Sequence, residues 1–122
     1  MNRVFQTAFH IPGTLAANLS IKWTAPFDCQ LVHVSAVGSN ANDATLAVGD
    51  STDADGFITA YAIGDSGTPV EKEALTDFDG ALADSQYPHI SNGDIIALTL
   101  DYDGAAGTAA DDVTIVLTFT EG

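Results

Sequence analysis

The residues best suited to metal chemistry are three aspartates followed by a glycine, Asp50, Asp53, Asp55 and Gly56. An EF-hand loop binds calcium through oxygen ligands at loop positions 1, 3, 5 and 12, and it needs a glycine at position 6. With the glycine at position 6, Ser51 falls at position 1 and Ala62 at position 12, so the first aspartate and the bidentate glutamate are missing. We therefore interpret this segment as a solvated turn. Weak cation binding stays open as an alternative here and at a second acidic group, Asp101, Asp103, Asp111 and Asp112.

A second segment with the composition of a reactive site is GDSGTP at residues 64–69, which is similar to the sequence around the nucleophile of trypsin-like proteases. A nucleophilic Ser66 would need a histidine base that a buried carboxylate holds in place. That fold needs a longer chain, and neither His10 nor His33 stands in the sequence context of its histidine. Asp65 also resembles the aspartate of dimeric aspartic proteases, but a glycine precedes it in place of an apolar pair. We interpret the segment as a surface turn and predict that the chain is not an enzyme.

Thiol and imidazole ligands are sparse. Cys29 is the single cysteine, so neither an intramolecular disulfide nor a pair of metal-binding thiols can form. Cys29 and His33 share one face of a predicted strand, where four residues span about 13 Å, too far to hold one metal. The remaining histidines, His10 and His89, are scattered, and we assign all three histidines structural or surface roles. No cofactor is predicted.

Alternation of apolar and polar residues is the dominant pattern and predicts β-strands. In residues 113–120 the apolar face is formed by Val113, Ile115, Leu117 and Phe119. In residues 94–100 it is formed by Ile96, Leu98 and Leu100. Further strands are predicted at residues 4–11, 15–23, 29–37, 44–48 and 57–63, with Pro12-Gly13 as a turn between the first two. Only residues 70–75 have the composition to begin a helix.

Turn sequences separate these segments, among them the hairpin dipeptides Asp55-Gly56 and Asn92-Gly93. About seven to nine short strands with regular turns predict an all-β fold, an antiparallel sandwich or barrel. No linker or repeat divides the sequence, so we expect one β domain over residues 1–122, in which residues 1–12 form either an N-terminal arm or an edge strand.

Charge is distributed unevenly along the sequence. The 122 residues include 3 Lys and Arg and 17 Asp and Glu, a formal net charge of −14. Such a chain repels nucleic acid and anionic membranes, so neither is predicted as a partner. Residues 1–42 carry a net +1, however, and residues 43–122 a net −15.

The nearly neutral first third also holds four of the ten aromatic residues, including the single tryptophan. Protein interfaces are enriched in aromatic residues and arginine and depleted of acidic residues. We therefore predict a partner interface formed by Arg3, Phe5, Phe9, Lys22, Trp23 and Phe27.

Two stretches, residues 11–51 and 89–122, resemble the small auxiliary head proteins of tailed bacteriophages, known as decoration or cementing proteins. The similarity covers roughly residues 11–120 and lies in Ala-, Thr- and Gly-rich strands, acidic turns and a final strand. It implies a jelly-roll-like β-sandwich, commonly a homotrimer, that binds the major capsid protein on the outer surface of the virion where capsomers meet. Because the sequence shows neither a signal peptide nor an apolar membrane span, we expect synthesis in the cytoplasm of a bacterial host.

The leading functional hypothesis is a non-enzymatic virion protein that decorates a phage capsid and stabilises it by bridging capsomers. The alternative is a carbohydrate- or receptor-binding β-sandwich of a phage tail or fibre, for which exposed aromatic rings would be needed. Its candidate residues are Trp23, Tyr61, Tyr87 and Tyr102.

Overall fold

The computed structural model describes residues 3–79, 86–103 and 106–122. Over this part of the chain the fold is all-β, as predicted, with one short 3-10 helix, η1 (Leu75–Asp77). No helix in the described ranges is long and apolar enough to cross a membrane. The strands are β1 (Val4–Thr14), β2 (Leu19–Thr24), β3 (Cys29–Val37), β4 (Thr45–Asp50), β5 (Ile58–Ala62), β6 (Val70–Lys72), β7 (His89–Ile90), β8 (Ile95–Asp101) and β9 (Asp111–Glu121).

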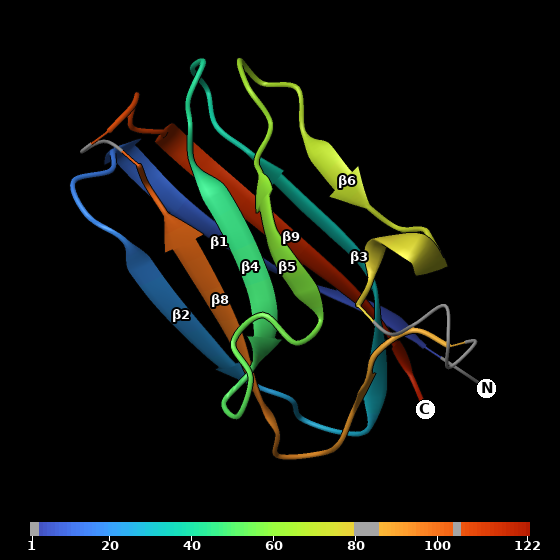
Figure 1. Ribbon diagram of the computed structural model, residues 1–122. Coiled ribbons are helices and arrows are strands. Elements are labelled where there is room, and N and C mark those ends of the chain that lie inside the picture. Colours follow the sequence, from blue (N-terminus) through green and yellow to red (C-terminus); the bar gives the residue numbers. More distant parts are fainter. Residues whose placement is uncertain (1–2, 80–85, 104–105) are drawn as a thin grey trace.

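The strands form two antiparallel sheets that pack face to face (Figure 1). One sheet has the order β1-β9-β3-β6, with β7 also paired to β3, and the other has the order β2-β8-β4-β5. The pairing is nested along the chain, because β4 pairs with β5, β3 with β6, β2 with β8 and β1 with β9. Such a long hairpin, folded over so that its pairs alternate between two sheets, is a jelly roll. The predicted sandwich is therefore confirmed, and its strand order is defined.

The inner faces of β8 and β9 supply the centre of the core. Val113, Ile115, Leu117 and Phe119 on β9 are fully buried, as alternation predicted. Ile96, Leu98 and Leu100 on β8 are buried to the same degree. Each of these strands has a neighbour on both sides, so its inner side chains are enclosed by strands of its own sheet and by the opposite sheet.

The turn predicted at Pro12-Gly13 is wrong. Strand β1 continues through both residues to Thr14, and its register with β9 shifts between Ile11 and Thr14. Gly13 has a φ of 78° there, and its N–H donates to Asp112 Oδ1 at 2.7 Å. A bulge at a sheet edge tolerates proline, because no neighbouring strand needs the missing N–H.

The helix start predicted at residues 70–75 is also wrong. Val70–Lys72 forms β6 and pairs with β3, so tertiary pairing overrides the local preference. Only the single turn η1 follows, and the Asp77 carboxylate accepts hydrogen bonds from the N–H groups of Glu73 and Ala74, both at 3.0 Å. Asn92-Gly93 forms a turn as expected, but it connects β7 to β8 in the opposite sheet instead of closing a hairpin.

The GDSGTP segment is a tight turn. Asp65 and Thr68 form an antiparallel bridge, and Ser66 and Gly67 between them have φ values of 51° and 82°. Positive φ at both central residues is the geometry of a type I′ turn. At Gly64 a Cβ atom would overlap the carbonyl oxygen of Thr68, so only glycine fits this backbone approach.

Replacing Gly64 by alanine is expected to lower the free energy of unfolding by about 1–3 kcal/mol, the usual cost of overpacking. Ser66→Gly is the matched control, because glycine accepts the positive φ that Ser66 already adopts, and its effect should stay within about 1 kcal/mol. Urea unfolding followed by tryptophan fluorescence measures both. Equal stability of Gly64→Ala and the wild type would contradict the close approach.

The stability of the η1 turn should depend on pH through Asp77. The two backbone N–H groups hold the pKa of this carboxyl below its ordinary value of 3.8. The folded state thus binds the proton less tightly than the unfolded state, so the carboxylate stabilises the fold above pH 3.8 and loses this effect as the pH falls below it. An NMR titration should place the Asp77 midpoint below 3.8, and Asp77→Asn should cost more stability at neutral pH than at pH 3. A midpoint above the ordinary value would contradict this.

Candidate partner interface

Strands β1 and β2 are the outermost strands of the two sheets on the same side of the sandwich (Figure 1). Each therefore has a described neighbour strand on one side only, and the inner side chains along this side are only half-buried. We call this row the seam, and it consists of Phe5, Phe9, Ile11, Leu19, Ile21 and Trp23. The seam is a strip where the hydrophobic core reaches the surface.

Aromatic rings concentrate at one end of the seam. Phe5 stacks on Phe119 with ring centroids 5.0 Å apart and meets Phe27 edge to face at 5.0 Å. Trp23 crosses from the other sheet to contact Phe5 at 6.1 Å and Phe119 at 5.0 Å. Because Phe119 is fully buried and the other three rings are half-buried, the cluster extends from the core to the surface.

Arg3 lies at the edge of this aromatic cluster. Its guanidinium pairs with Glu121, with Nη2 2.7 Å and Nε 3.0 Å from Oε2, and it also lies 5.9 Å from the centroid of the Phe27 ring. The Arg3 side chain is 74% exposed, so the ion pair contributes well under about 1 kcal/mol to stability. Its effect is to hold a planar cation near the half-buried Phe27 ring.

The structure brings together four of the six residues predicted for the interface, Arg3, Phe5, Trp23 and Phe27. Phe9 lies on the same inner face of β1, farther along the strand. Lys22 alternates to the outer face of β2, where it is exposed opposite Ala97. Their role in binding stays a prediction.

The sequence prediction missed four residues of this region, Ile11, Leu19, Ile21 and Glu121. The three aliphatic residues follow the same alternation as the aromatic ones, so periodicity could have identified them. Glu121 could not be found in this way, because its partner Arg3 lies 118 positions away in the sequence.

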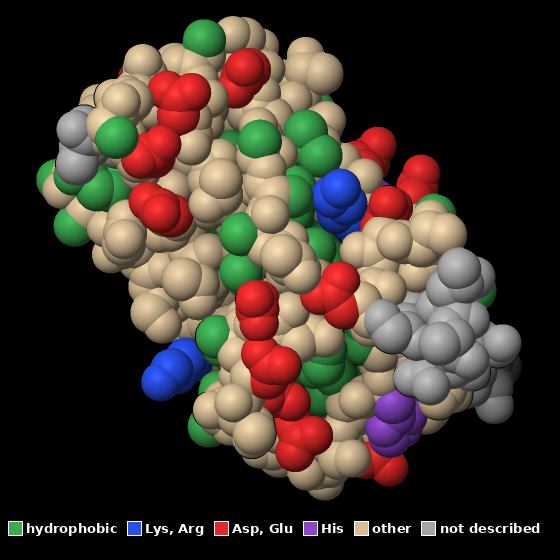
Figure 2. Space-filling model, viewed as in Figure 1, with side chains coloured by type: hydrophobic (Ala, Val, Ile, Leu, Met, Phe, Trp, Pro, Cys, Tyr) green, Lys and Arg blue, Asp and Glu red, His purple; other side chains and the backbone are tan. Residues whose placement is uncertain are grey.

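Acidic side chains lie mostly away from the seam. Among the described residues, β1 and β2 contain none, whereas β4, β8 and β9 carry them only at their ends, as Asp50, Asp101, Asp111, Asp112 and Glu121. Figure 2 shows red side chains at the upper left and through the lower part of the visible face, and a further group beside a Lys or Arg side chain at its right edge. The acidic side chains therefore lie mainly in turns and at the ends of strands. This describes their distribution better than the division of the sequence at residue 42.

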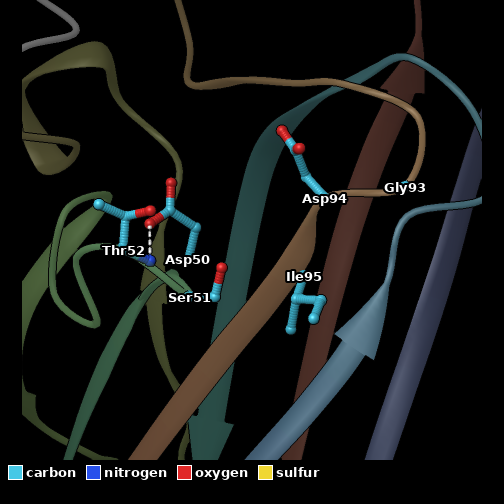
Figure 3. A pocket seen from close by; sticks show the side chains of 6 residues that line it. All are labelled: Asp50, Ser51, Thr52, Gly93, Asp94 and Ile95. Carbon is cyan, nitrogen blue, oxygen red and sulfur yellow. Dashed lines mark hydrogen bonds between the residues drawn. The ribbon is translucent and has the colours of Figure 1, made fainter.

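A polar pocket lies at one end of the sandwich, with a volume of about 370 Å³ (Figure 3). It is lined by Asp50, Ser51, Thr52, Gly93, Asp94 and Ile95. Asp50 Oδ1 accepts hydrogen bonds from the N–H groups of Thr52 and Asp53, at 2.9 and 2.8 Å, and Asp94 Oδ2 accepts one from Ser91 N–H at 3.1 Å. Both carboxylates thus cap turns, and the described residues contain no group of three or more His, Cys, Asp or Glu side chains that could hold a metal ion.

The other sequence candidates are dispersed over the fold. Ser66 lies in its type I′ turn, whereas His10 contacts Thr114 at 2.8 Å and His33 contacts Glu71 at 3.1 Å, so both imidazoles have partners elsewhere. Trp23 and Tyr61 lie on β2 and β5, the opposite edges of one sheet. Tyr87 packs against Phe78, and Tyr102 packs against the core after β8. These rings form no shared platform.

Cys29 is fully buried at the start of β3. Burial and the neighbouring Asp28 carboxylate both raise the pKa of its thiol, which keeps it protonated and unreactive at neutral pH.

Fold and seam together define a jelly-roll β-sandwich with one half-open apolar edge. No family model matches the sequence, and no curated protein is similar to it. Among solved structures, the chain is similar to a chain of the cyanophage Pam1 capsid asymmetric unit, with a TM-score of 0.56 and 14% sequence identity, over 99% of this chain and 85% of that chain. The TM-score shows that the two chains share a fold, and at 14% identity the similarity extends no further than the fold.

The aromatic cluster should contribute more to stability than the ion pair beside it. Phe5→Ala removes contacts with three rings from a half-buried site and is expected to cost about 2 kcal/mol. Arg3→Met removes the guanidinium but keeps an unbranched side chain of similar length, and it should cost less than about 1 kcal/mol. Thermal and urea unfolding of both variants test this, and a larger loss of stability from Arg3→Met than from Phe5→Ala would contradict the expected order.

Proposed function

We propose that this protein is a non-enzymatic structural component of a phage virion that binds the outer surface of the capsid and stabilises it by bridging capsomers. The observation that carries the proposal is the seam, a single apolar and nearly uncharged edge on an otherwise acidic molecule. Similarity of the fold to a chain of a cyanophage capsid supports it. The partner we propose is the major capsid protein.

The distribution of charge assigns different roles to the apolar seam and to the acidic turns. Contact with a shell removes apolar and aromatic surface from water at about 25 cal/mol per Å², and the six seam residues offer that surface and include no carboxylate. The acidic turns stay in solvent, where their like charge keeps the virion surface soluble and prevents non-specific association. The seam thus faces the shell and the turns face outward.

We further propose that the chain acts as one domain over residues 1–122 and that it assembles as a homo-oligomer, with a trimer favoured. Several identical seams held in one assembly bind neighbouring capsomers together, so avidity is gained without any single strong contact. Bridging of this kind resists the outward pressure of packaged DNA, because separating two capsomers requires breaking contacts with the oligomer. We place the protein in the virion after synthesis in the host cytoplasm.

A carbohydrate-binding role receives less support. Sugar sites commonly need aromatic faces exposed together, and Trp23, Tyr61 and Tyr87 are half-buried in three separate parts of the fold. A protease role also lacks support, since the Ser66 hydroxyl has no described hydrogen bond to a histidine.

Shell binding should depend on the charge beside the seam. Lys22→Glu places an acidic side chain on β2 and is expected to weaken binding about tenfold, because interfaces tolerate like charge poorly. The measurement is co-sedimentation of purified protein with capsids of the phage that encodes it, assembled without this chain.

Lys72→Glu is the matched control, because it changes the net charge by the same amount at β6, on the far side of the sandwich. It should bind like the wild type once both variants are shown to melt normally. Equal losses in both variants would place the interface elsewhere, and no binding of the wild type would overturn the proposed function.

A further inference from the structure

The four outermost strands of the two sheets are protected unequally against pairing with another strand. Strand β6 is only three residues long and includes the charged Glu71 and Lys72. Strand β5 is five residues long, and its register against β4 is shifted. Lys22 stands in the middle of β2. Short length, charge and irregular register are the usual devices that block edge-to-edge pairing. Strand β1 shows none of them over residues 4–11, which contain no Asp, Glu, Lys or Arg and are regular in register.

The free backbone groups of β1 can be assigned from its pairing. Glu121 N–H donates to the Arg3 carbonyl at 2.7 Å, so Arg3 and Glu121 form a hydrogen-bonded pair. Because such pairs alternate along an antiparallel ladder, the odd-numbered residues from Phe5 to Ile11 bond to β9. The even-numbered residues direct their N–H and C=O groups away from the sheet, and they are Val4, Gln6, Ala8 and His10.

The half-buried state of the seam has the same origin. A strand placed beside β1 would carry every second side chain over Phe5, Phe9 and Ile11 and against the inner face of β2. It would complete the core along the side where the sandwich is now open. The backbone groups and the seam therefore require the same occupant, an extended segment with apolar residues at alternate positions.

We propose that residues 4–11 of β1 accept an extended segment of the shell protein as an additional strand of the sheet. This inference rests on the proposed function and specifies how the shell is bound. The acceptor contains no Asp, Glu, Lys or Arg, so we expect the segment to contain none where it pairs. Asp112 lies beside the carboxyl end of β1, so the segment carries Lys or Arg where it leaves that end.

Charge favours a segment of the shell over a second copy of this chain at this edge. A second copy would bring its own net charge of −14, with acidic turns at both ends of its sandwich, close to those of the first. A single extended strand from a partner would not bring these acidic turns to the edge. The edge is thus suited to strand addition.

The test uses two substitutions at Ala8, whose N–H is one of the free donors and whose side chain is exposed. Ala8→Pro removes that donor without breaking a bond to β9, and an edge strand tolerates proline at such a position. Ala8→Thr keeps the donor and suits a strand, so it is the control for any effect of the side chain. Both variants are measured for melting temperature, native mass and co-sedimentation with capsids assembled without this chain.

We expect Ala8→Pro to fold with the wild-type mass and to bind capsids about tenfold more weakly, while Ala8→Thr binds as the wild type does. Equal binding of both variants overturns strand addition while leaving the proposed function intact. A changed native mass in Ala8→Pro alone would mean that a second copy occupies the edge, and this also overturns the proposal. If the wild type does not bind capsids, both the proposed function and this inference fail.

Discussion

The packing of β9 between β1 and β3 is the interaction on which the rest of the structure depends. This strand has a partner on both sides and presents Val113, Ile115, Leu117 and Phe119 to the core with no exposed surface. It also closes the nested pairing, since β1 has no other described neighbour. Without β9 the first strand would lose its register, and the ring of Phe119, on which Phe5 and Trp23 stack, would be absent.

The seam follows from the geometry of two finite sheets. Central strands are covered on every side, whereas the outermost strands have one lateral neighbour, so equally apolar residues are fully buried in β9 and half-buried in β1. A jelly roll leaves such an edge on each side of the sandwich. Here the side formed by β5 and β6 is short and partly charged, and the side formed by β1 and β2 is long and apolar. The two sides of the sandwich therefore differ in strand length and in apolar surface.

Period-two alternation identified seven of the nine described strands, because burial of one sheet face imposes that pattern locally, but it missed the short strands β6 and β7. It failed at Pro12-Gly13 and at residues 70–75, where pairing with a distant strand decided the conformation. Strand order and the Arg3–Glu121 pair also lay beyond it, since both join residues at opposite ends of the chain. Of the residues predicted for the interface, Phe5, Trp23 and Phe27 lie in one cluster, and their role in binding stays a prediction. Phe9 lies farther along β1, and the sequence pattern did not separate the outward-facing Lys22 from them. Only the fold determines which side of β2 it occupies.

The pairing of the first long strand with the last has a consequence for the order of folding. Contacts such as that between Arg3 and Glu121 span 118 positions, and loop closure over such a distance carries a large entropic cost before any contact repays it. Residues 111–121 leave the ribosome after all the other described strands, so β1 stays unpaired with β9 until then, while the β4–β5 hairpin can already form. The edge formed by β1 is therefore assembled only after β9 is available, and a chain that stops before residue 111 lacks the β1–β9 pairing altogether.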